Sequence, residues 1–203
     1  MSVGRRIGSR LALLLALALC LAALAACQRR EPLPDYWPAP RFSLVDQADA
    51  PFDSADLQGR IVVANFVYTT CTDICLLSTA KMREIQERLK QRGLFGSQVV
   101  LLSFSVDPVR DTPAVLAAYA ERFHADPQGW RFLTGDRDLV RHLLHDGFKV
   151  GFPEGQRPRG DDPGWIHTDR FVLIDRAYHV RAFPEMSDLD LDALMADIEA
   201  LAA

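Results

Sequence analysis

Two cysteines four positions apart, Cys71 and Cys75, stand where an apolar run gives way to a helical pattern. Residues 61–67 are dominated by apolar and β-branched side chains, which predicts a strand buried on both faces. Four residues make about one helical turn, so both sulfurs can face one point. Unpaired N–H groups and the dipole at a helix start stabilise thiolate. The pair therefore predicts dithiol redox chemistry or a site for a soft ion, Cu(I) or Zn(II).

A purely structural disulfide is the alternative for this pair. Closing a loop with three intervening residues removes little chain entropy, because the stabilisation grows with loop length. A domain of this size can also bury a full core without cross-links. We therefore expect the two thiols to serve chemistry rather than stability.

The first 26 residues have the pattern of an export signal. Three arginines precede an apolar run at residues 11–24, which is too short for a comfortable membrane span. Residues 24–27 have the sequence LAAC and resemble the bacterial lipobox, in which the cysteine is lipidated after cleavage before it. We expect an exported protein on the periplasmic or extracytoplasmic face, lipid-anchored to the membrane through Cys27. An uncut signal anchor is the alternative.

The mature chain would run over residues 27–203 and carry 20 basic against 27 acidic residues, a net charge of −7. This balance argues against a nucleic-acid partner, which requires a basic face. Residues 28–40 contain four prolines, so residues 27–40 are expected to form an extended tether. The folded domain is then predicted over residues 41–203.

Strand and helix patterns alternate along this domain. Strands are predicted at 42–45, 61–67, 99–106, 170–174 and 178–183, and helices at 73–91, 112–123, 136–146 and from 187 or 188 onward. The last two strands are predicted to form a hairpin around residues 175–177. The alternation predicts an α/β, thioredoxin-like three-layer sandwich with a mixed central sheet and flanking helices. Ligand sites in such sheets lie beyond the carboxyl ends of strands, where the two cysteines fall.

Two sulfurs rarely complete a metal site, so a third donor is expected among the five histidines. His167 precedes a predicted strand, and in a thioredoxin-like sheet that connection lies beside the dithiol. Four glycines and three prolines at residues 151–164 predict a mobile loop next to it. His142 and His145 are three apart on a predicted helix and could bind metal, although a solvated face is expected. The remaining two are interpreted as surface residues: His124 and His179.

Four sequence features together resemble the Sco/SenC family of copper chaperones for cytochrome c oxidase assembly. Residues 71–75 (CTDIC) resemble its Cys-x-x-x-Cys, and residues 105–113 (SVDPVRDTP) its Ser-Val-Asp-Pro-x-x-Asp-Thr-Pro stretch. Residues 130–135 (WRFLTG) resemble its Trp-x-x-Leu-Thr-Gly, and His167 takes the place of the family histidine. The resemblance covers about residues 41–200.

The resemblance implies copper bound as Cu(I), with Cu(II) as the other state, by Cys71, Cys75 and His167. It implies delivery to the copper-accepting subunit of the oxidase, with a periplasmic thiol reductant or copper donor as further partners. Two roles remain open for Asp107: it could tune the properties of the bound metal without binding it directly, or it could cap a turn. The family usually has proline after each cysteine, and here Thr72 and Leu76 stand instead, which affects the expected copper affinity and redox potential.

A thiol–disulfide oxidoreductase with Cys71 and Cys75 as its redox-active pair is the main alternative to a metallochaperone that is not an enzyme. A dithiol beside a helix start suits both functions. His167 discriminates between them, because dithiol exchange does not need a histidine ligand. A thiol peroxidase is a third, weaker alternative.

Overall fold

The fold is built around one mixed β-sheet. The structure, a computed structural model, describes residues 32–71, 74–150 and 169–203, and residues 34–203 form one unit. The elements are β1 (Trp37–Pro38), β2 (Ser43–Asp46), β3 (Pro51–Asp53), η1 (Ser54–Leu57), β4 (Ile61–Val67), α2 (Ile74–Gln91), β5 (Val99–Ser105), α3 (Pro113–Arg122), β6 (Trp130–Thr134), α4 (Arg137–His142), η2 (Leu143–Gly147), β7 (Val172–Ile174), β8 (His179–Ala182), η3 (Met186–Asp188) and α5 (Leu191–Ala202).

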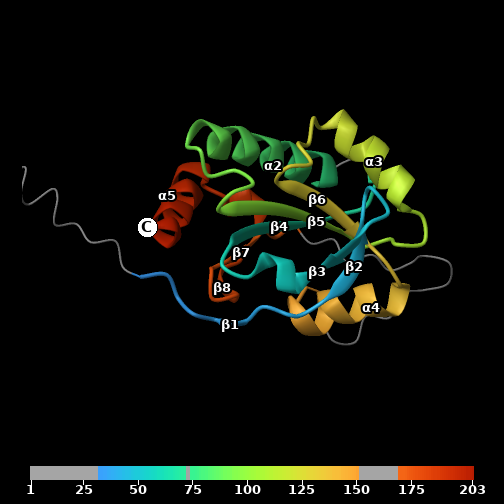
Figure 1. The fold of residues 1–203 in the computed structure, drawn as a ribbon, viewed down its shortest axis with the longest axis horizontal. Coiled ribbons are helices and arrows are strands. Elements are labelled where there is room, and N and C mark those ends of the chain that lie inside the picture. The colour runs from blue at the N-terminus through green and yellow to red at the C-terminus, as the bar shows by residue number, and fades with distance from the viewer. Residues whose placement is uncertain (1–31, 72–73, 151–168) are drawn as a thin grey trace, which may run out of the picture. The chain divides into compact units, whose positions relative to one another are not determined.

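In the described part of the chain the strand order is β1-β8-β7-β4-β5-β6-β2-β3 (Figure 1). The central strands β4, β5 and β6 are parallel, whereas β7 joins β4 and β2 joins β6 in antiparallel pairs. The predicted hairpin is present as β7 and β8. Parallel β4 and β5 place the segments that follow them at the same edge of the sheet.

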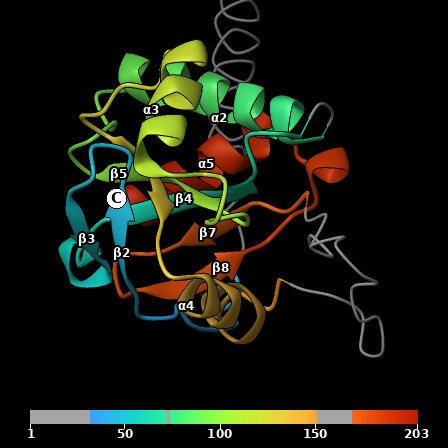
Figure 2. The ribbon, with the colours of Figure 1, turned by 90° about the vertical axis from the view of Figure 1, so that its right-hand side faces the viewer.

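Helices cover both faces of the sheet. Helices α2, α3 and α5 lie on one side and α4 lies on the other (Figure 2). All seven residues of β4 and of β5 are buried, as predicted for strands covered on both faces. Val62, Ala64 and Phe66 point into the apolar core that α4 closes. Asn65, on the opposite face of β4, reaches Ser78 of α2. The three-layer sandwich with a mixed sheet is confirmed.

Local sequence signals account for the helices nearest the cysteines. Met82, Ile85 and Leu89 form the buried face of α2, and Gly93 follows its end with φ of 68°. The N-cap of α3 is Thr112, whose hydroxyl accepts a hydrogen bond from the Val115 N–H, and Pro113 occupies the first turn. Both features were predicted from sequence.

Two predicted helices differ from the structure. The pattern at 136–146 predicts one helix, but α4 ends at His142 and continues as the π-helical turn η2. Pro40 packs against this turn so closely that a Cβ at Gly147 would lie 2.5 Å from its ring, which only glycine accommodates. The terminal helix begins at Leu191 rather than at 187 or 188, because the Asp190 carboxylate accepts hydrogen bonds from the first-turn amides.

The end of the predicted tether is part of the fold. Trp37 and Pro38 pair with β8, and the Tyr36 N–H donates to the Val180 carbonyl at 3.0 Å. The Tyr36 and Phe183 rings meet edge to face, 4.9 Å between centroids. The prolines predict a spacer here, but the aromatic side chains pack against the fold at these positions. The folded unit therefore begins before residue 41. The expected export signal and lipidated Cys27 lie outside the described residues. None of the helices in the described part is long and apolar enough to cross a bilayer.

Candidate dithiol site

Cys71 and Cys75 lie together where β4 passes into α2. Cys71 ends a short turn, and its N–H donates to the Tyr68 carbonyl at 3.1 Å. Cys75 lies in the first turn of α2, and its N–H donates to Sγ of Cys71 with an N···S distance of 3.4 Å. Both residues are buried thiols. The structure therefore brings the predicted pair together and directs an amide of the helix start at the first sulfur.

The second thiol holds its proton firmly. Burial raises the pKa of Cys75 from 9.0 to about 12, against the opposing effect of a hydrogen bond with the Tyr68 backbone. The neighbouring Cys71 and the charge of Asp111 raise it further. Cys75 is therefore protonated at neutral pH in the metal-free protein. A soft cation bound to its sulfur must displace that proton, so binding strengthens as pH rises.

The Cys75 carbonyl anchors the start of α2. It accepts hydrogen bonds from three hydroxyls: Ser78 at 3.1 Å, Thr79 at 2.7 Å and Tyr119 of α3 at 3.4 Å. The Thr79 and Tyr119 hydroxyls are also 3.0 Å apart, and burial raises the pKa of Tyr119 to about 12. These contacts tie the cysteine to a second helix as well as to its own.

A buried polar chain extends from the same carbonyl into the sheet. The Ser78 hydroxyl accepts from the Asn65 amide at 3.3 Å, and Oδ1 of Asn65 accepts from the Ser103 hydroxyl at 2.6 Å. The Ser103 hydroxyl in turn accepts from Nε1 of Trp130 at 3.0 Å. Strands β4, β5 and β6 are thus joined to the first turn of α2 by paired polar groups.

Asp111 is a buried neighbour of the pair, whereas its sequence pattern predicts only the lead into a helix. Its carboxylate accepts hydrogen bonds from the Thr69 N–H and hydroxyl and from the Ser105 hydroxyl. Burial raises the pKa of Asp111, against those hydrogen bonds. The signal in the sequence was its place in the 105–113 stretch, but its partner Thr69 lies 42 residues away.

Asp107 has the contacts of a turn residue. Its carboxylate accepts from the Arg110 amide at 3.3 Å and pairs with the Arg110 guanidinium at 2.9 Å. These bonds close the loop between β5 and α3. The capping role is therefore visible in the structure, and the tuning of a metal by Asp107 stays a prediction.

The histidines fall into two groups. His167 lies outside the described residues, so its role as a ligand stays a prediction, as does the loop at 151–164. His179 pairs with Asp35 at 2.7 Å, and His142 and His145 both pair with Asp146. No three His, Cys, Asp or Glu side chains in residues 32–71, 74–150 and 169–203 are arranged to hold a metal ion.

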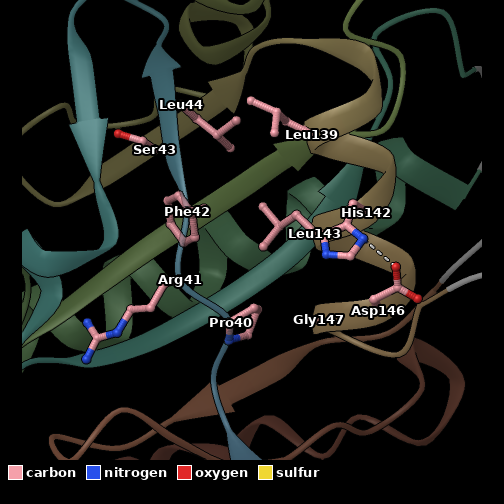
Figure 3. A pocket seen from close by; sticks show the side chains of 10 residues that line it. All are labelled: Pro40, Arg41, Phe42, Ser43, Leu44, Leu139, His142, Leu143, Asp146 and Gly147. Atoms are coloured by element: carbon pink, nitrogen blue, oxygen red, sulfur yellow. Dashed lines mark ion pairs between the residues drawn. The ribbon is translucent and has the colours of Figure 1, made fainter.

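A cavity with a histidine in its lining lies between the segment leading into β2 and the helix α4 (Figure 3). Its volume is about 320 Å³. The ion pair between His142 and Asp146 stands at its wall, and neither cysteine belongs to its described lining. The lining residues are Pro40, Arg41, Phe42, Ser43, Leu44, Leu139, His142, Leu143, Asp146 and Gly147.

Fold and site define a thioredoxin-like domain with a buried dithiol at the carboxyl end of a central strand. The sequence model of the SCO1/SenC family matches residues 35–203. The chain belongs to the SCO1/SenC family, as its motifs indicated.

Two relatives show the extent of the likeness. The chain is 36% identical over 138 residues to the SCO2-like protein of Rickettsia felis, covering 66% of this chain and 62% of that protein. It is 31% identical over 157 residues to the SCO1 protein homolog of Bacillus subtilis, covering 77% of each. The chain therefore spans less than two thirds of the length of the Rickettsia relative.

Solved structures confirm the predicted thioredoxin-like fold. A SCO1/SenC family lipoprotein from Bacillus anthracis has a TM-score of 0.71 and 32% identity, covering 86% of this chain and 99% of that one. BsSco, a Sco family cytochrome c oxidase assembly protein with a disulfide switch, has a TM-score of 0.69 and 27% identity, covering 86% and 97%. Copper-bound ScoI of Bradyrhizobium japonicum has a TM-score of 0.65 and 25% identity, covering 81% and 99%.

Proposed function

We propose that this protein is a copper chaperone that binds Cu(I) through Cys71, Cys75 and His167 and delivers it to the dinuclear copper site of a cytochrome c oxidase. The observation that carries the proposal is the buried thiol pair at the end of β4 in a SCO1/SenC chain. Copper in the related ScoI and the oxidase assembly role of BsSco support it.

The donor set fits this cargo. Two soft thiolates and an imidazole favour Cu(I) over hard cations. The buried position of both sulfurs limits access of water and oxidants. Transfer would proceed by ligand exchange, with thiolates of the acceptor replacing those of Cys71 and Cys75 one at a time. The ion stays Cu(I) throughout, so no electron moves.

The proposal includes a membrane location. Residues 1–26 would be removed as a lipoprotein signal, and acylated Cys27 would hold the domain at the extracytoplasmic face. The lipoprotein from Bacillus anthracis supports this reading. Intact-mass spectrometry of the mature protein, with Cys27→Ser as control, tests it: a mature wild-type chain without acyl mass would contradict the anchor.

Copper binding is tested on the reduced protein with a competing Cu(I) chelator. One ion per chain is expected, with sulfur and nitrogen ligands by X-ray absorption. His167→Ala should weaken binding and change the spectrum. His142→Ala, at an exposed histidine paired with Asp146, is the matched control and should change neither. A wild-type spectrum without nitrogen ligands would contradict the histidine.

A thiol–disulfide oxidoreductase is the second candidate, favoured by one contact. The Cys75 N–H directed at Sγ of Cys71 stabilises a thiolate there, as an attacking thiol requires. The disulfide switch of BsSco supports a reversible bond between the two cysteines.

Oxidase activity in copper-limited cells separates the two functions. For a chaperone, His167→Ala should fail like Cys71→Ser, and added copper should restore part of the activity. For a reductase, His167→Ala should stay active while both cysteine variants fail, and a chemical reductant should rescue those. An oxidase unaffected by all three variants would contradict both functions.

A further inference from the structure

The Asp111 carboxylate joins the turn before Cys71 to the end of β5 by hydrogen bonds to Thr69 and Ser105. The residue is 1% exposed. Its oxygens accept from the Thr69 hydroxyl at 2.5 Å, from the Thr69 N–H at 3.2 Å and from the Ser105 hydroxyl at 2.6 Å. Hydrogen bonds to a carboxylate are about twice as strong as neutral ones, so this cluster is a strong local constraint.

The constraint is transmitted to Cys71 through a short stretch of backbone. Thr69 lies inside the turn that the Cys71 N–H closes on the Tyr68 carbonyl. At the base of the same turn, the Val106 N–H donates to the Val67 carbonyl at 2.8 Å. The turn is thus fixed at its base by the sheet, at its middle by Asp111 and at its end by Cys71 itself.

We propose that Asp111 is the positioning residue of the thiol pair, and that its carboxylate, acting through Thr69, holds Sγ of Cys71 at the N–H of Cys75. The inference rests on the proposed function only in taking these cysteines as the working pair. Preorganisation of this kind raises the effective concentration of one sulfur at the other. Without it, Cys71 would sample positions from which neither a disulfide nor a shared metal ion can form.

Asp107 provides the matched control. It lies in the same loop, is equally buried at 1% exposure, and its carboxylate is bonded to Arg110. A substitution there removes a buried charge of the same kind from the loop while leaving the Thr69 contact in place. An effect confined to Asp111 therefore reports on the Thr69 contact rather than on loop stability.

The primary measurement is the equilibrium of the pair with glutathione. The two protein thiols lose two protons and two electrons to glutathione disulfide, which gives one protein disulfide and two glutathione thiols. Asp111→Asn is expected to lower the equilibrium constant about tenfold, which raises the midpoint potential by about 30 mV. Asp107→Asn should change the constant by less than about twofold. Equal shifts in the two variants would overturn the proposal.

A double-mutant cycle tests the route through Thr69. Thr69→Val removes the hydroxyl donor and Thr69→Ser keeps it. We expect Thr69→Val to reproduce most of the shift, Thr69→Ser to retain the wild-type constant, and the double variant with Asp111→Asn to be no worse than Asp111→Asn alone. Additive shifts, or a Thr69→Ser value equal to that of Thr69→Val, would show that Asp111 acts elsewhere.

The remaining outcomes are also decisive. If Asp111→Asn fails to fold by circular dichroism, the two Thr69 variants carry the comparison. Because burial of both sulfurs slows access of glutathione, the equilibrium is approached from the oxidised and from the reduced protein until the two agree. A wild-type pair that is still fully reduced at that point would overturn the proposal, because the proposal requires the sulfurs to be held within bonding reach. The readout needs no copper, so a failure of Cu(I) binding with the expected shifts would remove the proposed function and leave the positioning role.

Discussion

The dithiol end of the sheet and the cavity beside α4 differ in what they offer: the first holds reactive side chains, and the second holds empty volume. At the first, two sulfurs are buried among paired polar groups of β4, β5, α2 and α3. At the second, about 320 Å³ of space is lined mainly by apolar side chains, with exposed His142 paired to Asp146. The reactive atoms lie at the dithiol end, and a cavity without either cysteine in its lining lies at the other.

The difference shows that the reactive groups of a protein need not lie in a cavity. An organic substrate needs an enclosing pocket, because its affinity comes from buried surface. A single soft ion or a sulfur–sulfur bond needs only two or three donor atoms held at fixed positions. Hydrogen bonds to the surrounding backbone then replace the pocket as the feature that defines the site.

Loss of one sulfur should have the largest effect. Cys71→Ser or Cys75→Ser is expected to weaken Cu(I) binding at least about a hundredfold, close to 2.8 kcal/mol, because a hydroxyl is a poor ligand for a soft ion. Chelator competition on the reduced protein measures it. Wild-type affinity in either variant would show that the metal binds somewhere other than the dithiol.

A change in the polar chain should affect stability more than a change at the cavity. Asn65→Ala removes partners of Ser78 and Ser103 in the core and should lower the free energy of unfolding by about 2 kcal/mol. Leu139→Ser, at a residue 59% exposed beside the cavity, should change it by less than about 0.5 kcal/mol. Urea unfolding of both variants compares them. Equal losses would contradict the difference drawn between the two regions.

The free energy of unfolding should depend on pH through the buried Cys75 thiol at the dithiol end. The folded pKa of Cys75, about 12, lies above the ordinary value of 9.0, so the folded state keeps a proton that the unfolded chain releases. The free energy of unfolding of the reduced, metal-free protein should therefore fall as pH rises from about 9 toward 12. Tyr119 and Tyr178 contribute in the same direction, because their pKa values are also raised. The slope should be shallower in Cys75→Ser, and identical slopes would contradict the assignment.

The smallest effect is expected at the cavity wall. His142→Ala removes one member of an exposed ion pair, which contributes about 0.5 kcal/mol or less. Cu(I) affinity should stay within about twofold of wild type, since this ring lines a cavity to which neither cysteine contributes and is already paired with Asp146. A clear loss of affinity would make the histidines of α4 and η2 the next ligand candidates.

The sequence was sufficient where the determining contacts are local. The buried strands β4 and β5, the apolar face of α2 and the Thr112 cap follow from patterns within a few residues, and all are present. Motif resemblance identified the family, and the structure places Cys71 and Cys75 together. His167 and Cys27 remain predictions, because they lie outside the described residues.

Contacts between distant segments were not predictable in this way. Thr69 and Asp111 are 42 positions apart, and each is an ordinary turn residue within its own segment. The proline-rich stretch before residue 41 predicts a spacer, yet pairing with β8 and contact with Phe183 make its end part of the sheet. The π-helical turn after α4 ends at Gly147, which lies against Pro40 from a segment about a hundred residues earlier. Each of these features involves a partner that no local pattern reveals.

The hydrogen-bonded chain that starts at the Cys75 carbonyl connects the dithiol site to an intrinsic fluorophore. Four hydrogen bonds lead from the Cys75 carbonyl through Ser78, Asn65 and Ser103 to the Trp130 indole. Indole emission depends on the bonding of its N–H and on nearby charge, so a shift of the first turn of α2 should alter the fluorescence of a residue in β6. Occupation of the thiols by an ion or by a disulfide could then be followed in the unmodified protein, in real time and without a dye.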